Sequence, residues 1–411
     1  MIDFELSPEV ERTKQMIHML AEQAMRPISR EYDEREHEKP WDFLNMMWAA
    51  SANSPVSFGG DGKKAKKDDA PAAPSTRHLV SNVTIEELSW GDAGLYLSIP
   101  NPGLGGAAVA AAGTPEQRER FLARFKGGDP KWAAMAITEP GCGSDSAAIT
   151  TTAARDGDQW VINGTKIFVT SGLMAAEKSD GFVVVWATVD KSAGRAGIKA
   201  FVVERGTPGM TVTGTEHKLG IRASDTATIV FEDCRIPFDN ILGDPEVQKT
   251  TEGFKGVMAT FDATRPAVAA SAIGIGRAAV EFVRDALQEA GVPIRYGVAR
   301  TKLTALERDF MDMEANLQAA RLLTWRASWM MDQGLRNSLE ASMAKAKAGL
   351  AVTQVTQKAV ELLGPLGYSR KHLLEKWMRD AKINDIFEGT QQINMMIIAR
   401  RILGYSSKDL S

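Results

Sequence analysis

The sequence predicts a multi-domain α+β protein, with a helical N-terminal domain, a middle β-barrel or sandwich domain and a C-terminal four-helix bundle. Three observations predict this fold class. Apolar residues recur at helical spacing through most of residues 1–135, alternate with a period of two between turn residues over 136–240, and return to long helical patterns over 241–411. A chain of 411 residues is long enough for two or three domains. We therefore expect domain boundaries near residues 135 and 240.

The N-terminal domain is expected to contain several helices and one mobile loop. Helical patterns cover residues 9–28, 30–50, 83–88 and 115–125. Residues 51–76 break the pattern with glycines, three prolines and a cluster of lysines over 63–67. Such a charged stretch is usually a solvated linker, although its lysines could instead meet an anionic ligand or partner.

The middle domain, residues 136–240, is expected to be built from short strands. Asn163-Gly164, within the alternating stretch 159–170, predicts a β-hairpin turn. Further strands are predicted over 181–189, 198–204, 210–213 and 226–231. Strands this short and this closely spaced favour a small barrel or sandwich.

The C-terminal domain, residues 241–411, is expected to be a bundle of four long helices. The patterns predict these helices over 254–287, 302–333, 338–363 and 373–403. Pro266 lies inside the first of them and predicts a kink or a helix start. Glu388-Gly389-Thr390 interrupts the last.

Composition excludes several classes of function. The net charge of −3 gives no global reason to bind nucleic acid or an anionic membrane. Two cysteines exclude a disulfide framework, no Cys/His cluster has zinc-site spacing, and no metal site is expected. The N-terminus lacks the pattern of a signal peptide, and no apolar run of about 20 residues predicts a membrane span. A reducing, cytoplasmic location is therefore expected.

Three segments carry chemistry, and each has a structural alternative. The glycines of Met135–Asp145 suit a ligand loop, but equally a turn. Arg265 could bind phosphate, but a lone helical arginine is more often in a surface ion pair. Glu388 follows two apolar residues, where a raised pKa would suit a general base. Taken locally, a glutamate favoured by a helix N-terminus is the better interpretation of Glu388.

Taken together, these segments resemble the acyl-CoA dehydrogenase family. Residues 138–145 (TEPGCGSD) resemble its first signature, and 378–390 (MRDAKINDIFEGT) its second. Residues 219–226, followed by Val230-Phe231-Glu232-Asp233, resemble the end of its barrel. The resemblance covers about residues 5–404 and keeps the α–β–α order. The bundle is most similar to the medium-chain enzymes, notably over 261–266.

The resemblance implies an FAD-dependent oxidoreductase of fatty acid β-oxidation that converts an acyl-CoA thioester to a trans-2-enoyl-CoA. Glu388 stands at the family's base position and would remove the α-proton, while flavin N5 would take the β-hydride. The thioester oxygen is expected on the backbone N–H of the base and a flavin ribityl hydroxyl, which stabilise the developing charge. Some relatives place the base where this chain has Thr264, which cannot act as one.

Other roles implied by the resemblance transfer position by position. Phe168 stands where many relatives have a tryptophan, so a smaller ring would stack on the flavin. Residues 100–112, rich in Gly and Ala, would line the acyl-tail end of the pocket. Substrate contacts are expected from Ser144, Asp262, Arg265 and Gly389. FAD contacts are expected from Met135, Ile137, Thr138, Gly143, Ser144, Phe168, Thr170, Thr390 and Gln392.

Three departures from the family bear on cofactor binding and assembly. In the family, the arginine of an Arg-x-x-Phe-Gly motif reaches the FAD pyrophosphate of a neighbouring subunit. Here residues 293–297 (PIRYG) stand in its place without that arginine, and Arg295 or Arg300 could substitute for it. Glu361 stands where many relatives have a glutamine, and residues 51–76 replace a Gly-rich approach to the substrate site. The chain is thus expected either as a homotetramer with a rearranged FAD clamp or in a heterotetramer with a related subunit that supplies the arginine.

The resemblance also implies an electron-transferring flavoprotein as the acceptor. Two alternatives remain open from the sequence. One is an acyl-CoA oxidase, which passes electrons to oxygen. The other is a non-catalytic acyl-CoA-binding subunit of a mixed dehydrogenase assembly, against which the presence of Glu388 argues.

Overall fold

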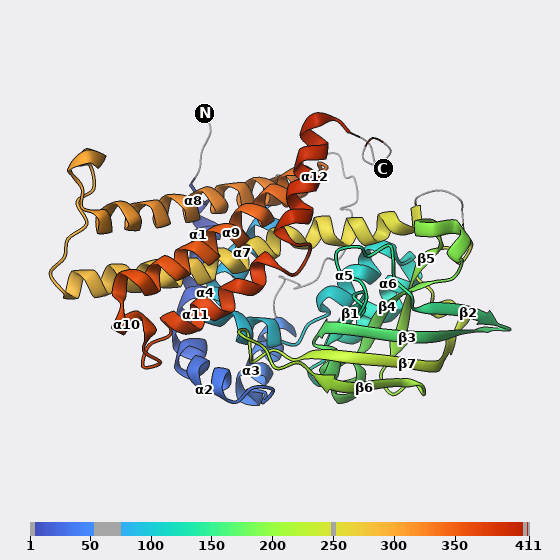
Figure 1. The fold of residues 1–411 in the computed structure, drawn as a ribbon. Coiled ribbons are helices and arrows are strands. Elements are labelled where there is room, and N and C mark those ends of the chain that lie inside the picture. The colour runs from blue at the N-terminus through green and yellow to red at the C-terminus, as the bar shows by residue number, and fades with distance from the viewer. Residues whose placement is uncertain (1–4, 53–74, 248–251, 406–408, 410–411) are drawn as a thin grey trace.

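The computed structural model describes residues 5–52, 75–247, 252–405 and 409. The expected mobile loop 51–76 lies almost entirely outside the described residues. Helices α1 to α6 come first, seven strands follow, and α7 to α12 complete the chain, with the sheet beside one end of the helical bundle (Figure 1). The α–β–α fold class predicted from the sequence is confirmed.

The N-terminal helices begin at residues that satisfy their free N–H groups. Ser7 accepts a hydrogen bond from Val10 N at the start of α1, and Thr114 and Gln117 form a capping box at the start of α6. The helices are α1 (Pro8–Leu20), α2 (Ser29–Glu34), α3 (Trp41–Ala52), α4 (Arg77–Ser98), α5 (Gly103–Ala112) and α6 (Pro115–Leu122), with a π turn over Ala21–Met25 and 3-10 turns over Arg26–Ile28 and Ala123–Phe125.

The prediction of one helix over 30–50 was wrong. The chain leaves the helical conformation between α2 and α3, where His37 has a φ of 74°. Pro40 has no N–H for a helical hydrogen bond, so the helix cannot continue through it.

The seven strands form a single curled, mixed sheet. They are β1 (Ala133–Ala136), β2 (Thr152–Asp156), β3 (Gln159–Thr170), β4 (Phe182–Thr188), β5 (Ile198–Glu204), β6 (Met210–Thr215) and β7 (Thr226–Pro237). The path is β1-β4-β2-β3-β7-β6, and β5 pairs with β4. Strand β1 lies parallel to β4, with Met135 opposite Val184. The sequence patterns missed β1 and β2, which are only four and five residues long.

The predicted hairpin turn at Asn163-Gly164 was wrong, because β3 runs straight through it. The turn lies instead at Gly157-Asp158, between β2 and β3. The β3/β7 register shifts beside Asn163, whose side chain accepts from Asp233 N at 2.8 Å. A Cβ on Gly164 would come 2.4 Å from Thr151 Oγ1, so this glycine permits close packing of the backbone rather than a turn.

The C-terminal bundle contains three long helices and a divided fourth segment. They are α7 (Glu252–Glu289), α8 (Ala305–Asp332), α9 (Ser338–Leu363), α10 (Pro365–Tyr368), α11 (Leu374–Ala381) and α12 (Gln391–Leu403), with 3-10 turns over Phe238–Asn240, Arg300–Lys302 and Lys382–Asp385. Helix α7 continues through Pro266, so the expectation of a helix start there was wrong. Pro266 is buried in this helix, which packs against α4, α8 and α9.

Among the residues that the structure describes, one helical segment, Phe261–Glu289, is long and apolar enough to cross a membrane by length and composition. However, 72% of its most apolar window is buried inside the protein. This segment is the central helix of the bundle, which explains its apolar composition.

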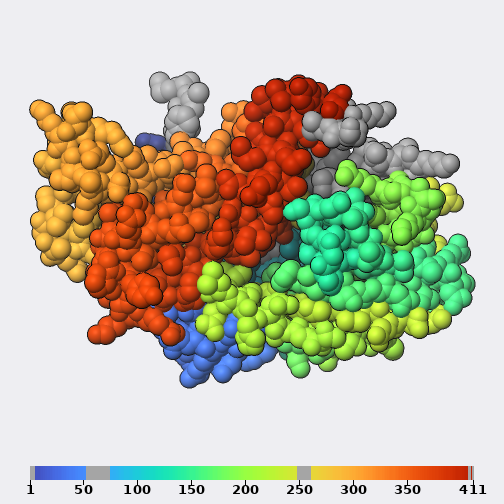
Figure 2. Space-filling model, in the orientation of Figure 1, coloured from blue at the N-terminus to red at the C-terminus, as the bar shows by residue number. Residues whose placement is uncertain are grey.

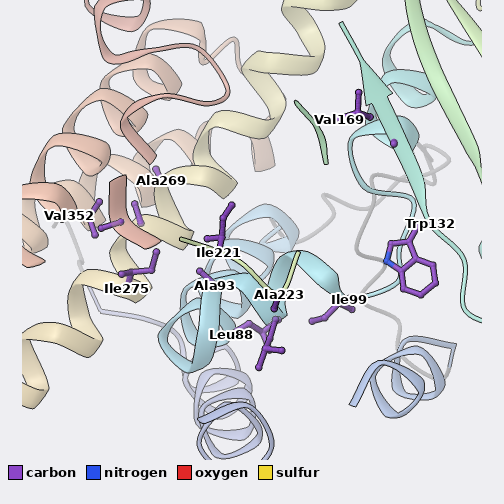
Figure 3. Close-up of a cluster of buried hydrophobic side chains, with 14 of the residues drawn as sticks. Leu88, Ala93, Ile99, Trp132, Val169, Ile221, Ala223, Ala269, Ile275 and Val352 are labelled. Atoms are coloured by element: carbon purple, nitrogen blue, oxygen red, sulfur yellow. The ribbon is translucent and has the colours of Figure 1, made fainter. Parts of the chain in front are cut away.

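The largest apolar core is continuous through all three parts of the chain. Leu88 of α4, Ile99 just after it, Val169 of β3, and Ile275 and Val352 of the bundle belong to one cluster (Figure 3). Ile221, just before β7, lies between α4 and the bundle in the same view, and Ala223 lies beside the end of α4. A shared core of this kind fixes the sheet against the helices and so fixes the geometry of any site between them.

Candidate active site

The loop before α12 presents Glu388 in an unusual backbone conformation. Glu388 has a φ of 56° and Gly389 a φ of 86°. The left-handed region is unfavourable for a residue with a Cβ and often marks functional sites. Thr390 is the N-cap of α12 and accepts from Ile393 N at 3.2 Å. Because Thr390 caps the helix, the local interpretation of Glu388 as a helix-terminal glutamate does not explain its position.

The Glu388 carboxylate lies against α7. Thr264 Oγ1 donates a hydrogen bond to Glu388 Oε2 at 2.8 Å. Burial raises the pKa of Glu388 above its usual value, and the Thr264 hydrogen bond and the charges of Arg265 and Lys345 only partly oppose this. A carboxylate with a raised pKa is a stronger base, as proton abstraction requires.

Arg265 lies in the interior beside this carboxylate. Its guanidinium pairs with Asp262 at 2.7 Å and reaches Ser342 Oγ at 3.4 Å. Only 3% of the residue is exposed, so the interpretation as a surface ion pair was wrong. Burial lowers the pKa of Arg265, and among the described residues its Nε has no hydrogen-bond partner. A buried donor without a partner is costly unless a ligand satisfies it.

Lys345 on α9 also belongs to this site, although the sequence analysis missed it. Its ammonium donates to the Gly389 carbonyl at 2.6 Å, and the residue is buried. Burial lowers the pKa of Lys345 to about 8. The only signal in the sequence was its helical spacing from Ser338 and Ser342, because the partner carbonyl is 44 residues away.

A buried ion pair anchors the loop that follows β1. Lys166 Nζ lies 2.8 Å from Glu139 Oε1, and both side chains are almost fully buried. Glu139 also accepts from the backbone N–H and hydroxyl groups of Thr150 and Thr151. These hydrogen bonds overcome the effect of burial and lower the pKa of Glu139 to about 2. Glu139 is therefore a charged anchor for the loop.

The anchored loop exposes the groups expected to meet a flavin. Gly143 and Ser144 are exposed, and a Cβ on Gly141 would meet nothing within 4 Å. Ile167 N donates to Thr138 O at 2.9 Å, which ties the loop to β3. Phe168, next along β3, has a φ of 56° and is 59% exposed. An exposed aromatic ring beside exposed hydroxyls and open backbone suits a flat heteroaromatic cofactor.

The other residues expected to contact FAD lie in three different environments. Met135 and Ile137 pack in a second apolar cluster beneath the loop. Thr170 is half-buried at the end of β3. Gln392 is exposed in the first turn of α12.

One turn of α7 contacts both the loop after β1 and the loop before α12. Phe261 packs against the second apolar cluster, as do Ile137 and Cys142. Thr264, one turn further along α7, holds Glu388. Figure 2 shows the surface hollowed where the red C-terminal segment meets the teal and green sheet domain. The structure thus directly joins Asp262, Arg265, Glu388 and Gly389, and α7 links them to the loop after β1.

The two arginines expected as substitutes in the FAD clamp already have carboxylate partners. Arg295 forms two hydrogen bonds with Glu307, at 2.7 and 2.8 Å. Arg300 forms two with Asp312, at 2.8 and 2.7 Å. Both lie between α7 and α8, at the end of the bundle away from the sheet (Figure 1). Glu361 pairs with Lys358 at 2.9 Å.

Within the described ranges, one group of side chains has the geometry to hold a metal ion: Glu36, His37 and His217. Glu36 already accepts from Lys218 N, from Arg222 and, depending on its tautomer, from His217. A cation there would compete with the Arg222 guanidinium for the same carboxylate oxygen.

The chain matches three domain models along its length. These are the N-terminal domain of acyl-CoA dehydrogenase over residues 7–129, its middle domain over 134–234 and its C-terminal domain over 251–403. It is 37% identical to the mitochondrial short-chain specific acyl-CoA dehydrogenase of Bos taurus, over 97% of this chain and 92% of that protein. It is 35% identical to the short-chain specific acyl-CoA dehydrogenase of Clostridium acetobutylicum, over 98% and 100%.

A solved structure is similar over the same length. Butyryl-CoA dehydrogenase from Megasphaera elsdenii matches with a TM-score of 0.82 and 30% identity, covering 98% of this chain and 100% of that one.

Proposed function

The chain belongs to the acyl-CoA dehydrogenase family, and on this premise we propose that Glu388 is the base of its reaction. The enzyme is an FAD-dependent oxidoreductase that converts an acyl-CoA thioester to an enoyl-CoA. The observation that carries the assignment is the half-buried Glu388 carboxylate, held by Thr264 at 2.8 Å on a left-handed turn. A base must be desolvated and aimed to remove a weakly acidic α-proton.

The residues present fit FAD. Thr138, Gly143, Ser144, Phe168 and Thr170 offer hydroxyls, open backbone and an exposed ring along one side, and Thr390 and Gln392 lie at the start of α12. FAD supplies the acceptor for the β-hydride when it is bound. With FAD bound, Glu388 would take the α-proton as the hydride leaves Cβ, and the carbon–carbon double bond would form between these two carbons.

The chain also offers a donor for the thioester oxygen. Within the part of the chain that the structure describes, the backbone N–H of Glu388 donates to no protein acceptor. A free N–H at this point stabilises the charge that develops on the oxygen during proton removal. We assign Ser144, Asp262, Arg265 and Gly389 to substrate contacts, with the partnerless Nε of Arg265 available to the CoA portion.

We propose a short, unbranched acyl chain as the substrate, because the relatives described above are named for short-chain or butyryl substrates. The test is anaerobic mixing of the yellow enzyme with a panel of acyl-CoAs of increasing length. Butyryl-CoA is expected to bleach the flavin fastest and to yield trans-2-butenoyl-CoA. Bleaching only by long or branched acyl-CoAs would contradict the chain-length proposal, and no bleaching by any acyl-CoA would contradict the reaction.

For the electron acceptor, we propose an electron-transferring flavoprotein. The acyl-CoA oxidase alternative predicts fast reoxidation of the reduced enzyme by oxygen with formation of hydrogen peroxide. Slow reoxidation by oxygen and fast reoxidation by the flavoprotein would support a dehydrogenase.

For the location, we propose a reducing compartment, the cytoplasm. Both cysteines are free thiols, which supports this proposal.

We further propose a mixed assembly in which a related subunit completes the FAD clamp; a homotetramer is the alternative. Arg295 would have to leave the buried Glu307 carboxylate without its partner to bind a pyrophosphate, which is unfavourable. The Arg300–Asp312 pair is exposed on both sides and is therefore easier to break. Co-purification of a second, related chain from the native host would support this assembly. A fully FAD-loaded, active assembly of this chain alone would contradict it.

A further inference from the structure

Lys345 is a buried cation in contact with the base loop, and the reaction described so far gives it no role. It lies on α9, is 1% exposed, and donates to the Gly389 carbonyl at 2.6 Å. In the described part of the chain it forms no ion pair with a carboxylate. Burying an ammonium without a paired carboxylate is unfavourable, so its retention calls for a specific role.

Successive residues along one face of α9 contact successive parts of the site. Ser338, Ser342, Lys345 and Gly349 follow each other at helical spacing on this face. Ser338 Oγ donates to Asp262 at 3.2 Å, and Ser342 Oγ accepts from Arg265 at 3.4 Å. Lys345 binds Gly389 O. A Cβ on Gly349 would lie 2.5 Å from Asn384 O, so this glycine lets the 3-10 turn before Glu388 pack directly on α9.

We propose that Lys345 is a positioning residue for the base: by holding the Gly389 carbonyl against α9, it fixes the left-handed Glu388–Gly389 turn and so the direction of the Glu388 carboxylate. The proposal rests on the proposed role of Glu388. Asn394 Nδ2 is the second donor to the same carbonyl, at 2.9 Å, but it belongs to α12, the helix that directly follows the loop. Lys345 is the contact that ties this carbonyl to a different helix.

The charge of Lys345 supports the function of Glu388, as its hydrogen bond to the loop does. The charged groups facing it are Arg265 on α7, Asp385 in the 3-10 turn, and Glu388 itself. The ammonium lowers the pKa of Glu388 and thus opposes the effect of burial. It therefore favours the ionised form of the base while it holds the backbone in place.

The test compares Lys345→Met with Lys347→Met in the flavin-loaded enzyme. Lys347 lies on the same helix and donates to Asn316 at 2.6 Å, so its replacement removes a lysine hydrogen bond without touching the base loop. For Lys345→Met we expect kcat to fall about tenfold or more with little change in KM. The acidic limb of the kcat–pH profile should move to higher pH by about half a unit or more, because a nearby positive charge is lost.

A second readout does not depend on turnover. Amide hydrogen exchange over residues 386–393 should become faster in Lys345→Met and stay unchanged in Lys347→Met. If Lys345→Met does not fold, Lys345→Gln keeps a donor without the charge and should still shift the acidic limb. An unshifted limb together with unchanged exchange would overturn the proposal, even if activity fell. Failure of the wild-type enzyme to dehydrogenate acyl-CoA would instead overturn the proposed function, while the exchange result would still report on Lys345.

Discussion

At the scale of single residues, the site depends on a carboxylate whose surroundings act on its pKa in opposite directions. Burial raises the pKa of Glu388, while Thr264, Arg265 and Lys345 lower it. Thr264 donates a hydrogen bond to this carboxylate. In the proposed mechanism, its hydroxyl therefore orients the base.

Replacing Thr264 tests this interpretation. Thr264→Ala removes a hydrogen bond to the ionised form of Glu388, so the pKa of Glu388 should rise by about one unit. Because the base must be ionised to work, the acidic limb of the kcat–pH profile should move to higher pH. Thr324→Ala is the matched control, since Thr324 bonds only a carbonyl of its own helix. An unmoved acidic limb in Thr264→Ala would show that this hydrogen bond does not orient the base.

At the scale of elements, Glu139 and Lys166 tie the loop after β1 to β3. Glu139→Gln leaves a buried ammonium without its partner and should lower the free energy of unfolding by about 3–5 kcal/mol. A second change, Lys166→Met, should restore part of this loss. Denaturant unfolding of the single and double variants measures both effects. No recovery in the double variant would show that the pair itself is not the cause.

The same pair predicts how stability depends on pH. The pKa of Glu139 is about 2 in the folded protein, below its usual value of about 4.5, so its contribution is full above pH ~4.5. That contribution should be lost as the pH falls from about 4.5 towards 2. Wild type and Glu139→Gln should therefore differ most in stability near pH 7 and converge at low pH. Equal differences at pH 7 and at the lowest accessible pH would contradict this.

Gly349 determines how closely the 3-10 turn before Glu388 packs against α9. In Gly349→Ala, a methyl group would meet the Asn384 backbone at 2.5 Å and should push the 3-10 turn outward, at a cost of about 1–3 kcal/mol. In Gly276→Ala, on α7, the methyl group would come 2.7 Å from the flexible end of Leu317 and 3.6 Å from Val352, with no backbone atom this close, so this change should cost less. Thermal unfolding and turnover of both variants measure the contrast. Equal losses in the two variants would argue against a specific role for Gly349.

The sequence predicted which elements exist better than where they end. Helical and alternating patterns identified most elements, because amphipathic periodicity reflects burial directly. Asn163-Gly164 misled the prediction, since it sits at a register shift between β3 and β7 rather than at a turn. For the site, the motifs indicated Glu388, Arg265 and Asp262. They could not indicate Lys345 or the Glu139–Lys166 pair, because those contacts join residues 44 and 27 positions apart.

At the scale of the whole molecule, Asp380 joins all three parts of the chain. It accepts from Ile221 N, beside the sheet, at 2.5 Å and pairs with Lys376 of α11 at 2.5 Å. Lys376 also pairs with Asp92 of α4 at 2.7 Å. This buried cluster and the shared apolar core fix the sheet domain relative to the bundle.

Breaking this joint should affect the whole fold. Asp380→Asn removes one of the two buried carboxylates that pair with Lys376, while Asp92 remains, and should lower the free energy of unfolding by about 1–3 kcal/mol. Calorimetry should show a lower unfolding temperature and a broader transition, because the parts of the chain would uncouple. Asp312→Asn is the control, since Asp312 pairs with Arg300 at the surface. An unchanged unfolding temperature and transition width in Asp380→Asn would contradict the role of this cluster in joining the three parts of the chain.

The central claim is that Glu388 removes the α-proton in an acyl-CoA dehydrogenase, and one measurement tests it most directly. Glu388→Gln keeps the size of the side chain and should keep the yellow flavin. Anaerobic mixing of this variant with the best acyl-CoA, followed in a stopped-flow spectrophotometer, should show flavin reduction slowed by a factor of about 10²–10⁴ or more relative to wild type. Flavin reduction in Glu388→Gln at the wild-type rate would contradict the account.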